Sequence, residues 1–417
     1  MKGPVTTVTR LKISAWRFVL TFGTVSLLAD FVYEGARSIT GPLLAELGAT
    51  ALVVGIVTGI GEAAALLLRL VSGPLADRTK RFWAWTLAGY ALTVISVPTL
   101  GFSGVLWVAC TLVILERIGK AVRSPANDAL LSFATASTGR GRGFAVHEAL
   151  DQMGAIIGPL VVAGMLALTG NDYGPSLAVL ALPGVTALGL LVWLRSQARH
   201  PLDYENAPTT VNTAIGLPRA STTPAVRLPR TFWLYSVFTG ITMLGFATFG
   251  VLSFHIVERG ILPPALVPVL YAGVMLIDAI AALTTGWAYD RFGPGFLLFL
   301  PVIAALVPIL SFTDALWPVI IGSLLWGAAL GVQESTLRAT IADLVPSNRR
   351  STAYGIFAAV LGVATAGGGA LTGALYGISI PTLIGVTIAL QALAIIMFIT
   401  SRLSRSHDHS TIEHAGE

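Results

Sequence analysis

The 417-residue sequence has few charged side chains: Asp, Glu, Lys and Arg make up 11% of it, and hydrophobic residues make up 54%. A soluble domain usually carries about 25% charged residues. The mean hydropathy is +0.79. This composition excludes a cytosolic enzyme and a disordered chain, because so few charges cannot cover a water-soluble fold of this length.

Cysteine is also nearly absent. Cys110 is the one cysteine and lies within an apolar run, so no intrachain disulfide can form and a disulfide-rich secreted scaffold is excluded. No Gly-rich phosphate-binding loop ending in Lys-Ser or Lys-Thr occurs, which argues against ATP-driven transport. The apolar runs leave no soluble region large enough for a catalytic domain. We therefore expect neither an enzyme nor a cofactor.

Long apolar runs dominate the sequence instead. A helix that crosses about 30 Å of hydrocarbon needs roughly 20 apolar residues. Twelve stretches meet this requirement, which predicts an all-α membrane protein with twelve transmembrane helices. They are residues 17–39, 50–71, 83–101, 105–125, 145–168, 175–195, 232–256, 265–287, 295–313, 317–338, 351–376 and 381–401.

One of the connections between these spans is long. Residues 196–230 are rich in Thr, Pro and Ala and contain no span, which is typical of a solvated linker. The linker divides the chain into an N-terminal six-helix bundle (1–195) and a C-terminal six-helix bundle (231–402), followed by a short tail (403–417). The sequence therefore predicts two six-helix halves.

The positions of the basic residues predict the orientation. If the N-terminus is cytoplasmic, 21 of the 26 Lys and Arg residues fall in cytoplasmic segments and only Arg259 falls in an outer loop. This distribution follows the positive-inside rule and predicts a multi-pass protein of the cell membrane with both termini in the cytoplasm. It also accounts for the net charge of +5, so we expect no nucleic-acid partner.

An internal repeat supports the division into halves. Gly73-Pro-Leu-Ala-Asp77-Arg78 follows the second span, and Gly286-Trp-Ala-Tyr-Asp290-Arg291 follows the eighth. Both read Gly-x-x-x-Asp-Arg, at the cytoplasmic end of the second helix of each half. Two related halves joined by a tether are how a rocking transporter is built, so the repeat predicts two pseudo-symmetric halves and alternating access.

These residues resemble the signature of the major facilitator superfamily, Gly-x-x-x-Asp-Arg-x-Gly-Arg-Lys/Arg. The chain has Gly73, Asp77, Arg78 and Arg81 but departs at Lys80, where the family usually has Gly, and at Phe82. The resemblance implies that Asp77 lies near the start of the eleventh span and acts as a conformational latch. The latch residues are expected to be Gly73, Asp77, Arg78, Arg81, Gly286, Asp290 and Arg291. A basic turn that only sets topology is the alternative.

The fifth span contains a second motif. Gly154, Gly158 and Pro159 resemble the Gly-x-x-x-Gly-Pro stretch of proton-driven drug antiporters in this superfamily. The same glycine spacing also allows ordinary membrane helices to pack closely. Both interpretations stay open at this point.

Charged residues within the spans are functional candidates, since a charge at the bilayer centre costs about 2.5–3.5 kcal/mol on insertion scales. Asp30, Glu34 and Arg37 share one face of the first span because they are four and three residues apart. Arg117 in the fourth span is expected at the depth of Asp30, and the resemblance to drug antiporters also points to an Arg there. We predict that Asp30 carries the proton and pairs with Arg117; a static ion pair is the alternative.

The other intramembrane polar residues are assigned secondary roles. Further proton-coupling candidates are Glu34, Glu62, Asp151 and Asp278, of which Asp151 is expected to reach Lys120. In this family the first and fourth spans line the central cavity. The expected cavity residues are Lys120, Arg123, Gln333 and Glu334.

The leading functional hypothesis is a proton-coupled antiporter that exports small amphiphilic compounds by alternating access. The alternative is proton-coupled transport of a small organic anion or a metal ion on the same fold. A non-transporting membrane sensor or scaffold is a third class, but a static scaffold does not need intramembrane charges. The expected partners are the transported molecule, protons and the lipid bilayer, with the protein acting as a monomer and no resident metal.

Overall fold

A computed structural model describes residues 13–135, 140–199, 228–345 and 349–413. Over these ranges the chain forms helices and no strand. The helices are α1 (Ala15–Glu46), α2 (Ala51–Leu67), α3 (Arg69–Thr79), α4 (Phe82–Gly101), α5 (Leu106–Thr135), α6 (Arg140–Thr169), α7 (Tyr173–Ala178), α8 (Ala181–Gln197), α10 (Arg230–Leu244), α11 (Phe249–Glu258), η1 (Pro264–Leu266), α12 (Val267–Phe292), η2 (Gly293–Leu298), α13 (Phe299–Ser311), α14 (Leu316–Leu344), α15 (Arg350–Ile378) and α16 (Ile380–Glu413).

Each of the twelve predicted spans lies in a helical segment, which confirms the all-α membrane fold. Within the described residues, ten segments are long and apolar enough to cross a membrane. The segment containing α13 is shorter, and α5 carries the charged residues Glu116, Arg117, Lys120 and Arg123 within its apolar run. Three predicted spans each consist of two consecutive α-helices, namely α2–α3, α7–α8 and α10–α11, and two more begin in a short 3₁₀ helix, η1 before α12 and η2 before α13.

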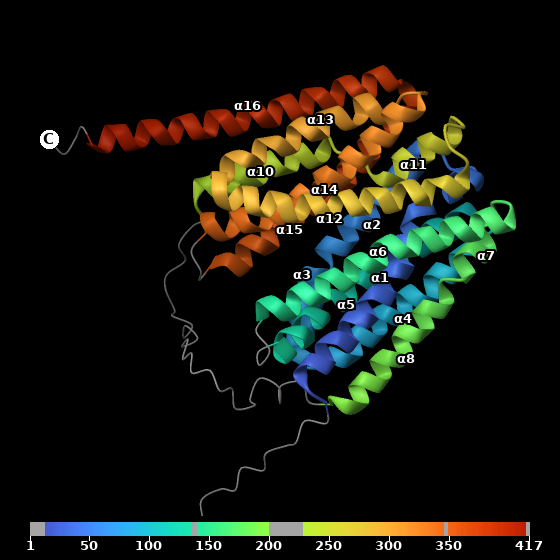
Figure 1. Ribbon diagram of the computed structural model, residues 1–417. Helices are drawn as coiled ribbons and strands as arrows, with labels where there is room; N and C mark the ends of the chain where they lie inside the picture. Colours follow the sequence, from blue (N-terminus) through green and yellow to red (C-terminus); the bar gives the residue numbers. More distant parts are fainter. Residues whose placement is uncertain (1–12, 136–139, 200–227, 346–348, 414–417) are drawn as a thin grey trace, which may run out of the picture.

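The helices form two groups that lie side by side (Figure 1). Helices α1–α8 form one group, in which α1 packs on α6 and α4 packs on α5. Helices α10–α16 form the other, in which α14 packs between α12 and α13. The groups meet along α2 and α15, along α6 and α12, and where α1 contacts α11.

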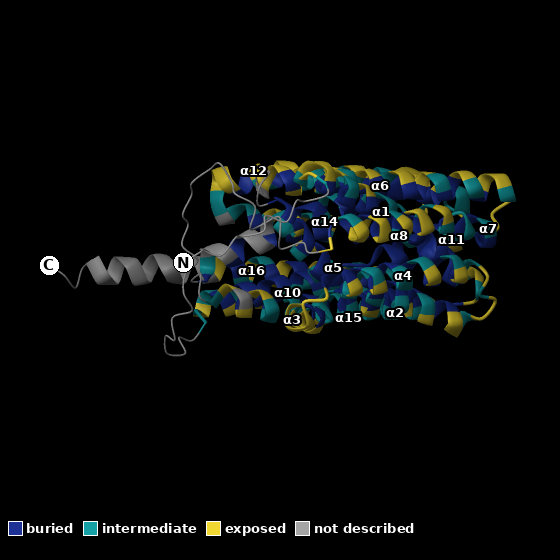
Figure 2. Ribbon diagram, turned by 90° about the horizontal axis from the view of Figure 1, so that it is seen from below, coloured by how far each residue is buried: buried dark blue, intermediate teal, exposed yellow. Residues whose placement is uncertain are grey.

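The outward faces of the helices are apolar and exposed (Figure 2). Leu168 is 84% exposed, Leu283 79% and Trp317 71%. A monomeric soluble protein rarely leaves such extensive apolar surface in water, whereas hydrocarbon solvates it without cost. This surface therefore fits the lipid-facing side of a membrane protein.

Glycines allow the closest helix contacts. Gly154 and Gly158 place α6 directly on the backbone of α1, where a Cβ atom would overlap Leu27 and Phe31. Gly369 of α15 and Gly55 of α2 meet in the same way between the two groups. Small residues that let backbones approach are a general device of membrane helix packing. The predicted motif of the fifth span thus has a packing role inside one group, and its antiporter role stays a prediction.

The two copies of the Gly-x-x-x-Asp-Arg repeat are each followed by a residue with positive φ. Lys80 follows α3 with φ of 52°, and Gly293 follows α12 with φ of 72°. Both residues hold the seventh position after the first glycine of their repeat, where a positive φ suits glycine. The structure thus explains why the family motif has Gly at this position, which Lys80 fills in the first copy.

Parts of the predicted domain organisation fall outside the described residues. Most of the predicted linker 196–230 does so, because residues 200–227 are not described. The predicted tail 403–417 differs from the structure in one respect. Helix α16 continues to Glu413, so residues 403–413 extend the last helix and do not form a separate segment.

The glycine contacts generate a test of stability. Replacing Gly158 with Ala should destabilise the protein by about 1–3 kcal/mol, because overpacking forces the α6 and α1 backbones apart. The matched control is Gly164→Ala on the same helix, where an added Cβ meets nothing within 4 Å. Thermal unfolding in detergent should show a lowered midpoint for the first variant only; equal midpoints would contradict the packing role.

Candidate functional site

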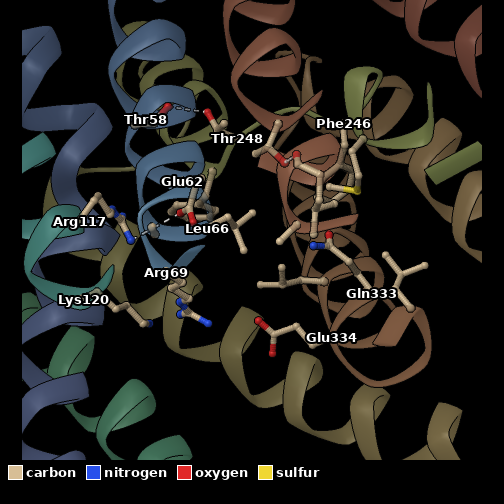
Figure 3. A pocket seen from close by; sticks show the side chains of 18 of the residues that line it. Thr58, Glu62, Leu66, Arg69, Arg117, Lys120, Phe246, Thr248, Gln333 and Glu334 are labelled. Atoms are coloured by element: carbon tan, nitrogen blue, oxygen red, sulfur yellow. Dashed lines mark hydrogen bonds and ion pairs between the residues drawn. The ribbon is translucent and has the colours of Figure 1, made fainter. Parts of the chain in front are cut away.

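A cavity of about 650 Å³ lies between the two helix groups (Figure 3). One wall, from α1, α2, α3 and α5, carries charged side chains. The opposite wall, from α10, α11, α14, α15 and the α10–α11 connection, is largely apolar and aromatic. The charged wall contains Glu34, Arg37, Glu62, Arg69, Arg117 and Lys120, and the aromatic wall contains Phe246, Phe249, Trp326, Tyr354 and Phe357, together with Gln333 and Glu334.

The cavity is closed at the end that carries the α1–α2 turn. There Gly41 of α1 packs on the Gly250 backbone of α11, and the Thr58 and Thr248 hydroxyls are 2.8 Å apart across the two groups. At the other end the cavity reaches Leu70 and Tyr354, which are exposed. The cavity is therefore accessible from the end at which α1 begins and α16 ends.

The seventh predicted span is interrupted at the cavity. Helix α10 ends at Leu244 and α11 begins at Phe249, and the unwound residues 246–248 line the cavity. Trp326 Nε1 donates to the Ala247 carbonyl at 2.7 Å, and Gln391 Nε2 donates to the Thr242 carbonyl at 2.9 Å. Irregular backbone at membrane depth is tolerated where it lines a cavity and is hydrogen-bonded, and interrupted helices form the substrate sites of many transporters.

The charges of the first wall form a chain of ion pairs. Arg37 Nη2 lies 2.9 Å from Glu62 Oε1, and Arg117 Nη1 lies 3.5 Å from the same oxygen. Arg117 Nε lies 3.3 Å from Glu116 Oε2. Glu62 therefore links the first and fourth predicted spans through two guanidinium groups, which offsets the cost of burying these charges.

Glu34 joins this chain to the opposite group of helices. Its carboxylate is 3.4 Å from Arg37 Nη1 and 4.0 Å from Lys120 Nζ. The Tyr271 hydroxyl of α12 donates to Glu34 Oε2 at 2.6 Å. Lys120 Nζ also lies 3.6 Å from the centre of the Tyr33 ring, a cation–π contact. Glu34 thus contacts two cations from its own group and a hydroxyl from the other.

A second buried cluster lies outside the cavity lining. Asp30 Oδ1 is 3.3 Å from Arg123 Nη2, and the Arg123 guanidinium stacks 4.5 Å from the centre of the Tyr90 ring. The predicted pairing of Asp30 with Arg117 is therefore wrong, because Arg117 pairs with Glu62 and Glu116 instead.

The carboxyl groups of Asp30 and Asp151 are within hydrogen-bond contact. Asp151 was expected to reach Lys120, whose charge does act on it, but its hydrogen-bond partner is Asp30. A carboxyl can donate a hydrogen bond to a neighbouring carboxylate only when it holds a proton. This pair is therefore a place in the interior of the first group where a proton can be held.

The residues predicted for the site divide into two sets. Six of them line the cavity: Glu34, Glu62, Arg117, Lys120, Gln333 and Glu334. Four lie outside the lining: Asp30, Arg123, Asp151 and Asp278. Arg123 was predicted as a cavity residue and is instead buried on another face of α5, because the six residues from Arg117 correspond to about one and two-thirds turns of helix.

Asp278 has a contact between the two groups. It is buried on α12, and the side chain of Gln152 on α6 lies close enough to act on its carboxyl. This contact lies at the α6–α12 interface, opposite the α2–α15 interface. A proton-coupling role for Asp278 stays a prediction.

The predicted latch is not closed in this conformation. Asp77 and Arg78 are exposed at the end of α3, and within the described ranges no ion pair joins Asp77 to α15. Arg81, Asp290 and Arg291 are also exposed, and the Arg291 guanidinium lies 5.7 Å from the centre of the Trp287 ring. The latch implied by the family belongs to the opposite conformation, which leaves that role a prediction.

Sequence reasoning missed the contribution of Tyr271, Trp326 and Phe246. Aromatic residues are spread over many spans, and no spacing distinguishes these three. Arg37 carried a usable signal, since it shares a helical face with Asp30 and Glu34. The partner of Tyr271 is 237 residues away in the chain, which no local pattern reveals.

The comparison with known proteins follows this geometry. The sequence model described as Major Facilitator Superfamily matches residues 24–272 and 261–417. The chain is 63% identical over 397 residues to the uncharacterized protein Rv2265 of Mycobacterium tuberculosis, covering 95% of this chain and 96% of that protein. It is 29% identical over 153 residues to the multidrug resistance protein MdtH of Edwardsiella ictaluri, covering 36% of this chain and 37% of MdtH.

Solved structures show the same fold. A mutant of the nucleoside transporter NupG superimposes with a TM-score of 0.73 at 12% sequence identity, covering 91% of this chain and 100% of that one. The family match spans both helix groups, and the cavity between them has the arrangement that a transporter requires. This chain is a multi-pass membrane transporter, not an enzyme, and belongs to the major facilitator superfamily.

Proposed function

We propose that the protein is a proton-coupled antiporter that exports small amphiphilic compounds. The observation that carries this proposal is the two-sided cavity, with ion-paired charges on one wall and aromatic rings on the other. A molecule with a charged group and an apolar body satisfies both walls at once. The charged wall alone would leave the apolar body of such a molecule without contacts, and the aromatic wall alone would leave its charged group without a counter-charge.

The proposed direction rests on the orientation of the chain. With both termini in the cytoplasm, the accessible end of the cavity faces the cytoplasm and the closed end faces outward. A compound then enters from the inside, and rocking of the two six-helix halves, 1–195 and 231–402, would release it outside. The partial likeness to a multidrug resistance protein agrees with this class of substrate.

The proposed proton route uses the buried carboxylates. Asp30 is the leading carrier, now with Arg123 as its partner and Asp151 as the second carboxyl of the pair. Protonation of Asp30 removes the charge that holds Arg123, so the energy of this cluster changes with each proton bound. Glu34 and Glu62 are secondary carriers because they face the cavity directly.

Transport of a small organic anion is the second candidate. Arg69 and Lys120 face the cavity from the same wall (Figure 3), and cationic groups of this kind bind carboxylates. No observation favours a metal ion, since among the described side chains no group of three His, Cys, Asp or Glu residues is placed to hold one.

Proteoliposomes with an imposed pH gradient test the proposed function. We expect the gradient to drive uptake of amphiphilic compounds, measured with a panel that includes lipophilic cations, organic anions and divalent metal ions. Dissipating the gradient with a protonophore should abolish accumulation. Movement of anions alone would favour the second candidate, and accumulation that persists without a gradient would exclude proton coupling.

Replacing Asp30 with Asn tests the proton carrier. We expect loss of gradient-driven accumulation, because the amide cannot exchange the proton. Exchange of the same compound across the membrane without a gradient should remain. Full gradient-driven accumulation in this variant would contradict the assignment.

A paired control separates coupling from stability. Asp30→Asn alone leaves the buried Arg123 without its counter-charge, which is destabilising by about 3–5 kcal/mol in comparable buried pairs. The double variant Asp30→Asn with Arg123→Gln removes both charges. We expect it to recover expression but not gradient-driven accumulation.

A further inference from the structure

The contact between Tyr271 and Glu34 differs from the Thr58–Thr248 contact, which also joins the two halves. The Tyr271 hydroxyl of α12 donates to the carboxylate of α1 at 2.6 Å, and both side chains are buried. A hydrogen bond to a carboxylate is roughly twice as strong as one between neutral groups. The Thr58–Thr248 contact nearby joins two neutral hydroxyls, so its strength does not depend on a bound proton.

Glu34 is also accessible to the cavity, whose wall it helps to form. A proton or a substrate that enters the cavity can therefore reach the acceptor of this hydrogen bond. Charged and titratable groups face Glu34 from α1, α2, α5, α12 and α14. They are Arg37, Glu62, Glu116, Arg117, Lys120, Tyr271, Asp278 and Glu334.

The aromatic wall leads directly to Tyr271. The Phe246 and Trp326 rings are stacked with centroids 5.7 Å apart, and Trp326 lies 5.6 Å from Phe249. The Phe249 ring lies 4.4 Å from that of Tyr271. A substrate that occupies the aromatic wall thus presses on the ring that positions Tyr271.

We propose that Tyr271 and Glu34 form a lock between the two halves, which stays closed while Glu34 is charged and the cavity is empty. The lock holds the α1–α2 end shut, and either a proton on Glu34 or a substrate against Phe249 releases it. The inference rests on the proposed proton-coupled exchange and deepens it. Tyr271 is a positioning residue here and does not bind the substrate.

Such a lock would keep the empty, unprotonated carrier in one conformation, which coupled exchange requires. An antiporter loses its drive if the empty, unprotonated carrier can change conformation, because the gradient then dissipates without moving substrate. A charged Glu34 held by Tyr271 stabilises the empty carrier in the conformation whose cavity is closed at the α1–α2 end. Protonation weakens the hydrogen bond and leaves Arg37 and Lys120 without the Glu34 charge, so the other conformation becomes populated.

The test measures the conformation directly and needs no substrate. Cys110 is replaced by Ala, and spin labels are placed at Phe102→Cys and Ile378→Cys, two exposed positions on opposite halves at the closed end. Distances are measured by double electron–electron resonance in lipid nanodiscs between pH 5 and pH 9. The parent should show a single short distance at pH 9 and an added long distance at pH 5.

Tyr271→Phe should show the long distance already at pH 9, with the ratio of the long-distance to the short-distance population raised about 10-fold to 100-fold over the parent at that pH. Glu34→Gln should behave in the same way, and adding Tyr271→Phe to it should change nothing further. If Tyr271→Phe does not fold, Glu34→Gln carries the same test.

Tyr235→Phe is the matched control. The Tyr235 hydroxyl donates to the Leu337 carbonyl at 3.1 Å within one half, so its removal should leave the parent distances unchanged. Parent distances in Tyr271→Phe at pH 9, or a parent without pH dependence, would overturn the proposal. Failure of the pH gradient to drive any compound would instead refute the proposed function, which the distance measurement does not use.

Discussion

The structure depends on one constraint: a charge inside the membrane must have a partner. The helices of the first half carry Asp30, Glu34, Glu62, Arg117 and other charges at positions that cannot reach water on the lipid side. Asp30, Glu34, Glu62 and Arg117 are each held by an opposite charge, and the resulting pairs link α1, α2 and α5. The pairs stiffen that half, since breaking any one of them leaves an uncompensated buried charge.

The second half differs from the first in its cavity wall and in the course of its backbone. Its cavity wall is aromatic, and its irregular feature is the break between α10 and α11. Trp326 and Gln391 satisfy the carbonyls near this break, so these two carbonyls are not left unpaired where the unwound residues face the cavity. One half therefore contributes charge and the other contributes shape and apolar surface. The cavity acquires its two-sided character from this division.

Much of the fold was predictable from the sequence, because apolar runs of about 20 residues have few alternatives in a membrane. The repeat at Gly73 and Gly286 indicated two related halves, and the charged and polar residues within the spans included six that line the cavity. The pairing of Asp30 with Arg123 was not predictable. Arg117 and Arg123 are six positions apart, and only the rotation of α5 in the packed structure decides which of them reaches Asp30.

The contact of Tyr271 with Glu34 could not be predicted from the sequence for a related reason. Its hydroxyl meets Glu34 only when two halves far apart in the chain are assembled, and tyrosine is too frequent in the spans to stand out. The break after Leu244 was equally hidden, because its residues are as apolar as their neighbours. Contacts between the halves, in contrast to the spans themselves, leave no periodic signal.

The positive φ angles of Lys80 and Gly293 have an energetic consequence. Both residues have positive φ at equivalent repeat positions, so each half leaves its second span through a backbone conformation that favours glycine. A left-handed conformation costs an ordinary residue roughly 1–2 kcal/mol and costs glycine almost nothing. The two halves thus share the sign of φ at this turn but not its conformational energy. The costlier turn, at Lys80, belongs to the half that carries the ion pairs of Asp30, Glu34 and Glu62.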